Sequence, residues 1–305
     1  MEIQKVTAII SFLILGIILK KLIIEEKLKA QVPLILNKII IYICLPALIL
    51  KVMPTIEIKG NAWFYPLSHW FALFLLATLT YATSKALKFE RKTLGCLLIL
   101  IPLGNTSFLG YPMVEVFFGT EALPYAVLYD QLGSFLGLAI YAPIILSIYS
   151  DDKIPTLKTF LKSIVSFPPL IALLFSLTFK ELILNEFIQT MVPPLSQGII
   201  PLAMIAVGLQ FQRPSKDLGL PLTLGLSYKM ILSPLLTLLF FIMFGLLDRP
   251  EKVLIFQSAM PPMITAAILA SEKGLHKNLS ISLTGLGLLL SFIILPACFS
   301  LLRLF

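Results

Sequence analysis

The chain has 305 residues, of which 58% are hydrophobic and 13% are charged, and its formal net charge is +8. A soluble domain carries about a quarter charged residues, so this composition excludes an ordinary water-soluble protein and favours lipid as the solvent for most of the surface. The basic residues lie between apolar runs and not in blocks with interleaved aromatic residues, so we expect no nucleic-acid partner.

The chain also lacks the short motifs of common enzymes. It has no metal-ligand spacing, phosphate-binding loop or nucleophile elbow, and His69 and His276 lie far apart in the sequence. Cys44, Cys96 and Cys298 each lie inside an apolar run, as small buried hydrophobic residues do. We therefore expect a protein that is not an enzyme and that has no metal site, cofactor or disulfide.

Runs of apolar residues between charges and helix breakers predict ten transmembrane helices, because crossing a hydrocarbon core takes roughly 20 residues. In chain order they span residues 5–20, 33–53, 62–86, 92–117, 121–149, 157–179, 187–211, 218–246, 251–272 and 279–303. The chain is thus expected to be an all-α integral membrane protein, multi-pass in the cell membrane, with the lipid bilayer around it.

The basic residues predict how these helices are oriented. Sixteen Lys and Arg residues fall in the connections 1–2, 3–4, 5–6, 7–8 and 9–10, and seven fall on the other side. Cytoplasmic loops carry the excess of basic residues. Both termini are therefore predicted to lie on the extracytoplasmic side.

Prolines recur at similar spacings in the two halves of the chain. The spacings are 20 and 46 residues in helices 2 to 4, and 20 and 41 in helices 7 to 9, for Pro46, Pro66, Pro112, Pro201, Pro221 and Pro262. Five helices in each half imply two inverted repeats, residues 1–150 and 151–305, with further breaks at Pro46 in helix 2 and Pro201 in helix 7. The alternative is that these prolines only kink their helices for packing.

Helix 4 contains the strongest local signal, a run from Ile101 to Pro112 with two prolines, two glycines and three side chains that form hydrogen bonds. Such a run cannot continue as a regular helix in lipid, because the freed backbone groups need partners. Helix 9 has a related run from Gln257 to Thr265. We predict that both helices break and cross at the bilayer midplane, where their half-helix N-termini suit an anion. The predicted substrate-binding residues are Asn105, Thr106, Ser107, Pro112, Gln257, Pro261 and Pro262, with Lys229 of helix 8.

Ionisable residues inside the spans are costly and point to function. Lys229 would offset an anionic substrate or pair with a carboxylate, and the alternative is that it snorkels to the interface. Asp130, next to Gln131 in helix 5, would exchange a proton or form a static ion pair. His69, beside Trp70 in helix 3, would titrate near neutral pH or serve in packing.

The segments around these residues resemble the auxin efflux carrier family over essentially the whole chain. The similar segments run from Tyr42 to Leu48 in helix 2, from Gly104 to Pro112 in helix 4, from Ile200 to Leu209 in helix 7 and from Gln257 to Pro261 in helix 9. The helix 4 segment, followed by Tyr129-Asp130, is the most specific of these.

This resemblance implies a fold akin to that of bile acid sodium symporters and sodium/proton antiporters, usually as a homodimer. Helices 1, 2, 6 and 7 would form a scaffold, and helices 3–5 and 8–10 a moving transport domain. Pro112 and Pro261 match the crossing prolines, Asn105 matches a substrate-site asparagine, and Gln257 matches a sodium-binding position of distant symporters. Ser166-Phe167-Pro168 departs from related sequences, which often place Asn before this proline, so the resemblance does not supply a second substrate-contacting amide and does not by itself identify indole acids as the substrate.

These features favour a secondary active transporter, of the efflux type, that moves a small organic anion such as a carboxylate or auxin-like acid by alternating access in an elevator mechanism. Asp130, Gln131, Gln257 and His69 are the candidates for proton or sodium coupling. Two alternatives stay open. One is a sodium/proton antiporter of the same fold, and the other is a membrane sensor that binds a ligand without moving it.

Overall fold

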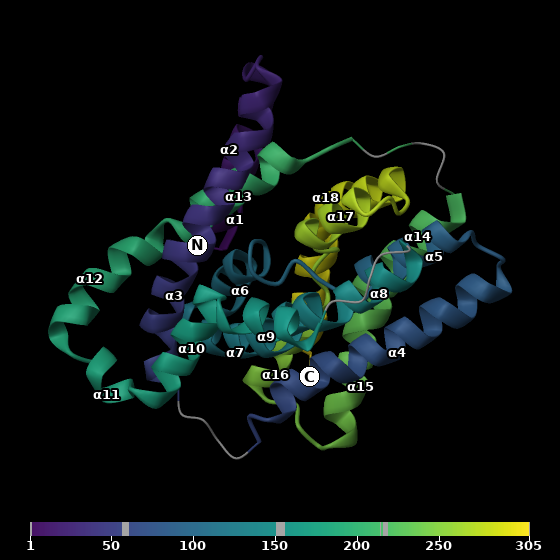
Figure 1. Cartoon of the computed structure of the whole chain (residues 1–305). Helices are drawn as coiled ribbons and strands as arrows, with labels where there is room; N and C mark the ends of the chain where they lie inside the picture. The colour runs from purple at the N-terminus through teal and green to yellow at the C-terminus, as the bar shows by residue number, and fades with distance from the viewer. Residues whose placement is uncertain (1, 57–60, 151–155, 214, 216–218, 305) are drawn as a thin grey trace. The chain divides into compact units, whose positions relative to one another are not determined.

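In a computed structural model of the chain, residues 2–56, 61–150, 156–213, 215 and 219–304 are described, and the regular structure in these ranges is helical (Figure 1). The α-helices are α1 (Glu2–Leu22), α2 (Glu26–Ile39), α3 (Leu45–Val52), α4 (Phe64–Ala86), α5 (Arg91–Leu100), α6 (Gly110–Phe118), α7 (Leu123–Tyr129), α8 (Ala142–Tyr149), α9 (Leu157–Val165), α10 (Pro168–Thr178), α11 (Lys180–Ile183), α12 (Glu186–Gln197), α13 (Ile199–Gln210), α14 (Gly219–Ser227), α15 (Ser233–Met243), α16 (Arg249–Ser258), α17 (Ile264–Glu272) and α18 (Lys277–Leu302). The expectation of an all-helical chain is confirmed for these residues.

Several of the described segments are apolar enough to cross a membrane. Five qualify by length and composition: Glu26–Thr55, Thr120–Tyr149, Thr190–Gln210, Gly219–Met243 and Lys277–Leu302. A sixth is formed if α9 and α10, which are bent by 65° at their junction, are counted as one span. The chain is therefore a multi-pass membrane protein, and the inverted arrangement of ten helices stays a prediction.

Some features used in the sequence argument lie outside the described residues. The second expected repeat begins at residue 151, the first of the undescribed residues 151–155, and the loop residues Lys59, Lys153 and Lys216 also belong to undescribed segments. The orientation of the termini stays a prediction as well.

π-Helical turns interrupt the long helices of the described chain. η1 (Ile40–Cys44) lies between α2 and α3, and η6 (Tyr228–Leu232) lies between α14 and α15. η4 (Asp130–Phe135) and η5 (Gly137–Tyr141) lie between α7 and α8. Such turns occur frequently at functional sites, and η4 and η6 carry two of the ionisable residues singled out in the sequence. There are also two short 3₁₀ turns among these residues. η2 (Met53–Thr55) follows α3, and η3 (Thr120–Ala122) precedes α7.

The chain folds as two compact units. The first unit comprises Met1–Gly60, Ser107–Val127 and Lys162–Phe211. The second unit comprises Asn61–Thr106, Leu128–Leu161 and Gln212–Phe305.

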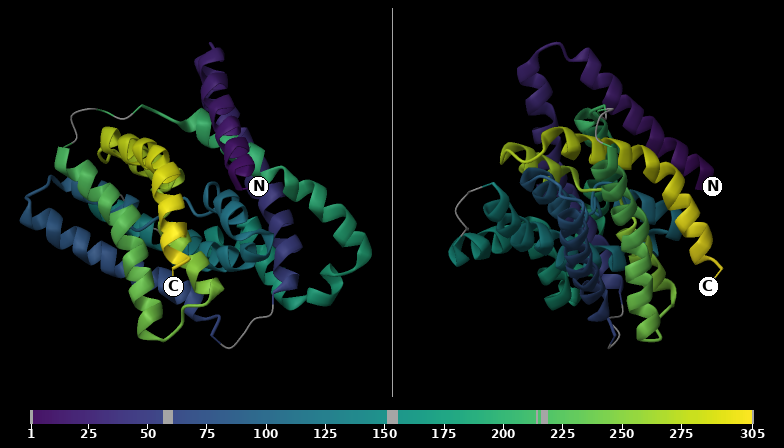
Figure 2. Two further views of the ribbon diagram at one scale, coloured as in Figure 1. Left: turned by 180° about the vertical axis from the view of Figure 1, so that it is seen from behind. Right: turned by 90° about the vertical axis from the view of Figure 1, so that its right-hand side faces the viewer.

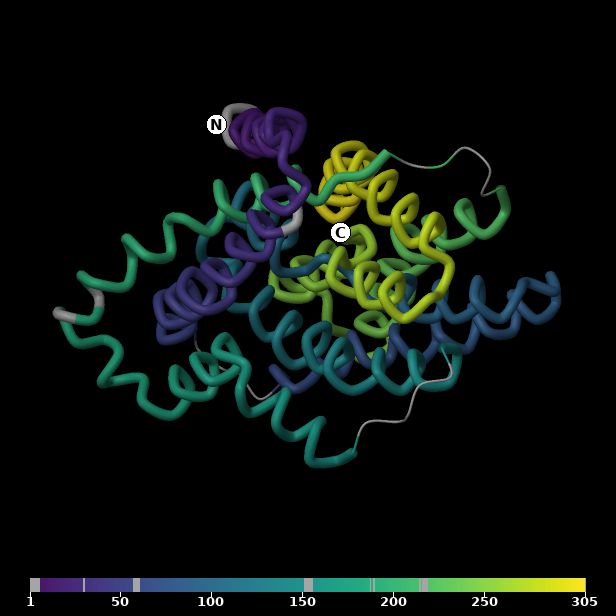
Figure 3. Tube along the Cα trace, turned by 45° about the horizontal axis from the view of Figure 1, so that its top comes forward, coloured from purple at the N-terminus to yellow at the C-terminus, as the bar shows by residue number. Residues whose placement is uncertain are grey.

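In the first unit, α1 packs along α13 (Figure 2), and two glycines allow the close approach. A Cβ atom on Gly16 would lie 2.3 Å from the carbonyl oxygen of Ile205, and one on Gly208 would lie 2.3 Å from that of Leu13. Small residues of this kind let helices associate in lipid, where there is little hydrophobic driving force between them. Both α10 and α12 pack against α3. The short helix α11 connects α10 to α12, so the chain passes around α3 between them (Figure 3).

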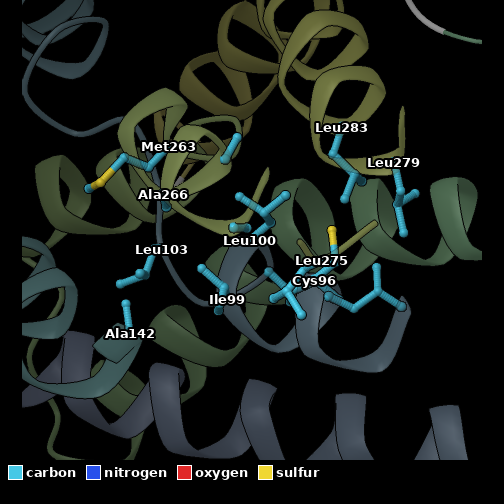
Figure 4. Close-up of a cluster of buried hydrophobic side chains, with 14 of the residues drawn as sticks. Cys96, Ile99, Leu100, Leu103, Ala142, Met263, Ala266, Leu275, Leu279 and Leu283 are labelled. Atoms are coloured by element: carbon cyan, nitrogen blue, oxygen red, sulfur yellow. The ribbon is translucent and has the colours of Figure 1, made fainter. Parts of the chain in front are cut away.

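The second unit has a hydrophobic core to which α4, α5, α8, α14, α17 and α18 contribute. Leu103 and Met263, which follow α5 and α16 in the chain, lie in the same cluster as Leu279 and Leu283 of α18 (Figure 4). Burial of apolar side chains from the non-helical segments anchors these segments in the unit. The unit therefore fixes the backbone on which the candidate site is built.

Candidate functional site

Both helix breaks predicted from the sequence are present. α5 ends at Leu100 and the next helix, α6, begins at Gly110. α16 ends at Ser258 and α17 begins at Ile264. Each gap contains proline, which has no N–H group for the helical hydrogen bond and clashes with the preceding turn. The two gaps contain most of the residues that the sequence assigned to the substrate.

Within the second unit, the two non-helical segments pair with each other through their backbones. The amide of Asn105 donates to the carbonyl of Pro261 at 2.8 Å, and the amide of Met263 donates to the carbonyl of Leu103 at 3.0 Å. Together these bonds form a single antiparallel β-bridge. They satisfy backbone groups that the helix breaks set free, as an apolar environment requires. Backbone hydrogen bonds thus hold the two breaks together.

Lys229, in η6, brings a positive charge to this pair of segments. Its side chain is 2% exposed, and its ammonium donates to the carbonyl of Ser258, the last residue of α16, at 3.1 Å. A Cβ atom on Gly104 would lie 3.0 Å from both Cε and Nζ of Lys229, so the glycine makes room for the ammonium. Within the described ranges Lys229 has no carboxylate partner. An ammonium has three donors, and burying an unpaired charge costs several kcal/mol, so this lysine is suited to meet an anion.

Asp130, in η4, connects several of the predicted residues. Its carboxylate is buried and accepts hydrogen bonds from the Thr106 hydroxyl and, at 2.7 Å, from the side-chain amide of Gln131. The backbone carbonyl of Thr106 accepts a hydrogen bond from Nε2 of Gln257 at 3.3 Å. These four residues form one hydrogen-bonded network. Its oxygen atoms are of the kind that hard cations prefer, and a carboxylate can also carry a proton.

Some polar groups near the breaks have no hydrogen-bond partner. Oε1 of Gln257 and Nε2 of His69 are buried without one. The side-chain amide of Asn105, which is 5% exposed, makes no hydrogen bond to the described residues. Because buried polar groups are normally paired, these atoms are available to a ligand, an ion or water.

His69 packs closely against helix 5. Its ring meets the ring of Tyr129 edge-on, with centroids 5.0 Å apart and an interplanar angle of 87°. A Cβ atom on Gly133 would lie 2.7 Å from Cβ of His69, so glycine is needed at this contact. The ring of His69 therefore serves in packing, which was the alternative expected for this residue, while its Nε2 has no hydrogen-bond partner among the described residues.

The remaining predicted residues belong to the first unit. Pro112 is buried in the first turn of α6, and Ser107 precedes that helix. At Pro46 the helix continues, because η1 leads directly into α3 with Pro46 in its first turn. Pro201 lies in the first turn of α13, and α12 is separated from α13 by Gly198 alone. Helix 2 is thus interrupted by a π-helical turn and helix 7 by a single residue, whereas helices 4 and 9 each contain a longer non-helical gap.

The sequence matches the family described as membrane transport protein over residues 3–155 and 153–299. The chain belongs to this membrane transport protein family. A protein of Methanocaldococcus jannaschii named as an uncharacterized transporter is 28% identical over 256 residues, which cover 80% of this chain and 81% of the relative. Another uncharacterized transporter, from Methanothermobacter thermautotrophicus, is 26% identical over 297 residues, or 96% of each chain. The resemblance to auxin efflux carriers seen in the sequence is thereby confirmed at the level of the family.

Three contacts of this membrane transport protein were not predicted from its sequence. These are the bond from Lys229 to the Ser258 carbonyl, the room that Gly104 leaves for Lys229, and the packing of His69 on Gly133. Glycine within a transmembrane segment signals close approach of another element. The sequence did not indicate which element that would be, because the approaching side chains come from distant parts of the chain.

Proposed function

We propose that this membrane transport protein is a secondary active carrier, of the efflux type, for a small organic anion such as a carboxylate or an auxin-like acid. The observation that carries the proposal is the buried Lys229 ammonium beside the paired helix breaks, without a carboxylate partner in the described chain. An ionisable residue buried in this way marks a substrate or ion pathway in a membrane protein. In this proposal the substrate carboxylate accepts hydrogen bonds from Lys229 and from the side-chain amide of Asn105.

The local backbone supports an anionic substrate. Met263 is extended and α17 begins at Ile264, so the first N–H groups of α17 have no partner within the helix. A helix N-terminus carries a partial positive charge that favours anions. Pro112, Pro261 and Pro262 would hold the breaks open, while Thr106 and Ser107 would bind other polar groups of the substrate.

For the mechanism we propose alternating access by an elevator-like movement, with ten helices in two inverted repeats and with a homodimer as the working form. Helices 1, 2, 6 and 7 would form the scaffold, and helices 3–5 and 8–10 the moving domain. The separation into two compact units supports a division of this kind, because the second unit contains α4, α5 and α14 to α18. The first unit, however, includes α6, the second part of helix 4, and most of α7 in helix 5, which the resemblance assigns to the moving domain.

We assign ion coupling to Asp130, Gln131, Gln257 and His69, with a proton or a sodium ion as the coupling ion. The support is the buried network of Asp130 and the unpaired atoms of Gln257 and His69. The same network favours a second candidate function, sodium/proton antiport. That alternative needs a titratable carboxylate near the breaks, and Asp130 accepts a hydrogen bond from Thr106.

Counterflow into liposomes that contain the purified protein tests the proposal. Radiolabelled malate, lactate and indole-3-acetate are the probes, and we expect at least one of them to accumulate. Lys229→Met and Asn105→Ala should each lower the flux by about tenfold or more, because a charge-assisted hydrogen bond or an amide contact to the substrate is lost. Lys92→Met is the matched control, since Lys92 is exposed at the start of α5.

Two results would reject the proposal: none of the three acids binds or moves, or both Lys229→Met and Asn105→Ala transport as well as the unmodified protein. Imposed pH and sodium gradients distinguish the second candidate. An antiporter would move sodium and protons without any carboxylate. In the carrier, Asp130→Asn should abolish the response of carboxylate flux to the gradient, because an amide cannot take up a proton and carries no charge for sodium.

A further inference from the structure

The first unit contains a cavity that shares no lining residue with the paired breaks of helices 4 and 9. Its volume is about 140 Å³, and its polar lining consists of Lys51, Glu115, Thr120, Ser196 and Gln197. These residues come from the C-terminal end of α3, from α6, from η3 and from the C-terminal end of α12. All the lining residues belong to the first unit, so the cavity is complete within it.

The lining of the cavity contains two opposite charges that form no ion pair with each other. Lys51 forms no hydrogen bond or ion pair with the described residues. Glu115 is not within ion-pairing distance of Lys51, and its carboxylate accepts a hydrogen bond from the Thr120 hydroxyl at 3.2 Å. Opposite charges that line one cavity without pairing can each bind the complementary charge of a ligand.

The local backbone positions the acidic side of this cavity. Gly119, between α6 and η3, has φ of 88°, a conformation that residues with a Cβ atom rarely adopt. A Cβ atom on Gly119 would lie 2.6 Å from a carboxylate oxygen of Glu121. The turn at this glycine returns the chain so that Thr120 reaches Glu115. The carboxylate is thereby oriented by a hydroxyl and not by a cation.

The rest of the lining is aliphatic and comes from Leu48, Leu123, Ile199 and Ile200. Leu48 and Lys51 are three residues apart on α3 and so lie on one side of that helix. A cavity of about 140 Å³ has the volume of four or five water molecules at about 30 Å³ each. It is smaller than the pockets of roughly 300–1,000 Å³ that hold drug-sized ligands. The occupant must therefore be small.

We propose that this cavity is a binding site for a small aliphatic zwitterion, with an α-amino acid such as valine as its type. The carboxylate of the ligand pairs with Lys51, its ammonium pairs with Glu115, and its aliphatic side chain lies against Leu48, Leu123 and Ile199. This inference does not depend on the carrier function proposed above, because no residue is shared between the two sites.

Calorimetric titration of the full-length protein in detergent with three matched ligands tests the proposal. L-valine carries both charges, isovalerate lacks the ammonium and isobutylamine lacks the carboxylate. We expect L-valine to bind, and each analogue to bind at least about tenfold more weakly, because one charge-assisted contact is lost. Equal binding of isovalerate and valine, or no binding of valine at millimolar concentration, would overturn the proposal.

Variants assign the binding to this cavity. Lys51→Met should weaken valine binding at least about tenfold and leave the weak binding of isobutylamine unchanged, whereas Glu115→Gln should weaken valine binding and leave isovalerate unchanged. Lys27→Met and Glu181→Gln are matched controls, because both residues are exposed in the same unit. If both cavity variants bind valine normally, the site is wrongly assigned. Should either variant fail to fold, the comparison of the three ligands on the unmodified protein still decides the question.

Discussion

At the scale of single residues, the position of Lys229 suits two roles, one structural and one in the proposed anion binding. Its ammonium donates to the carbonyl of Ser258, which ends α16 and would otherwise lack a helical partner. A cation at a helix C-terminus is also favoured by the helix dipole. One of three donors is used in this way. The same side chain can therefore stabilise the break in helix 9 and bind an anion.

Gly104 offers a test of this double function. In Gly104→Ala the new Cβ atom would lie 3.0 Å from both Cε and Nζ of Lys229, at the flexible end of that side chain. We expect the ammonium to be displaced, carboxylate binding to weaken by about tenfold and the fold to be retained, since a flexible side chain can yield. Binding is measured by titration with whichever carboxylate the counterflow experiment identifies.

The control for Gly104→Ala is a double-variant cycle with Lys229→Met. If the glycine acts only by making room for the lysine, the double variant should bind the carboxylate no more weakly than Lys229→Met alone. Additive losses would show that Gly104 affects binding by another route, and this account of the residue would be wrong.

At the scale of elements, the sequence predicted interruptions that depend on local chemistry. The gaps in helices 4 and 9 follow from proline, which cannot continue a helix in lipid whatever surrounds it. The 65° bend between α9 and α10 was likewise indicated in the sequence, by Phe167-Pro168. The residue before a proline disfavours the helical conformation, so a helix tends to end there. That signal was present in the sequence, yet the segment was predicted as one helix.

The π-helical turns η4 and η6 were not predicted from the sequence. Neither turn contains a proline, although Pro234 follows η6 in the first turn of α15. The network from Asp130 to Thr106 and Gln257 joins residues up to 151 positions apart. Residue types identified the candidates for the site. Their partners depend on packing that a single sequence does not specify.

The crossing of α1 and α13 makes a prediction at this scale. In Gly16→Ala the Cβ atom would lie 2.3 Å from the backbone oxygen of Ile205, so the two helices must separate. Overpacking of this kind costs about 1–3 kcal/mol, and we expect a lower apparent Tm in detergent. Gly198→Ala is the matched control in the same unit, because its nearest neighbour would be a side-chain atom at 3.4 Å. An equal Tm for the two variants would contradict this description of the crossing.

At the scale of the whole molecule, the orientation in the membrane decides from which side each site is reached. Both termini are predicted to be extracytoplasmic, because sixteen basic residues fall on one side of the predicted helices and seven on the other. Alkaline phosphatase is active only outside the cytoplasm, and green fluorescent protein fluoresces only inside it. Fused to the C-terminal end of the chain in a bacterial host, the phosphatase should therefore be active and the fluorescent protein dark.

The matched control places the same two reporters after Lys88, between α4 and α5, in a connection predicted to be cytoplasmic. The reporters should then behave in the opposite way, with an inactive phosphatase and a fluorescent green fluorescent protein. If both fusion sites reported the same compartment, the number of spans between them would be even and not odd, which would contradict the ten-helix prediction. If both sites reported the reverse of the expected pattern, the odd number of spans between them would stand and only the orientation would be inverted. The pair of fusions therefore tests separately whether the number of spans after Lys88 is odd and in which direction they run.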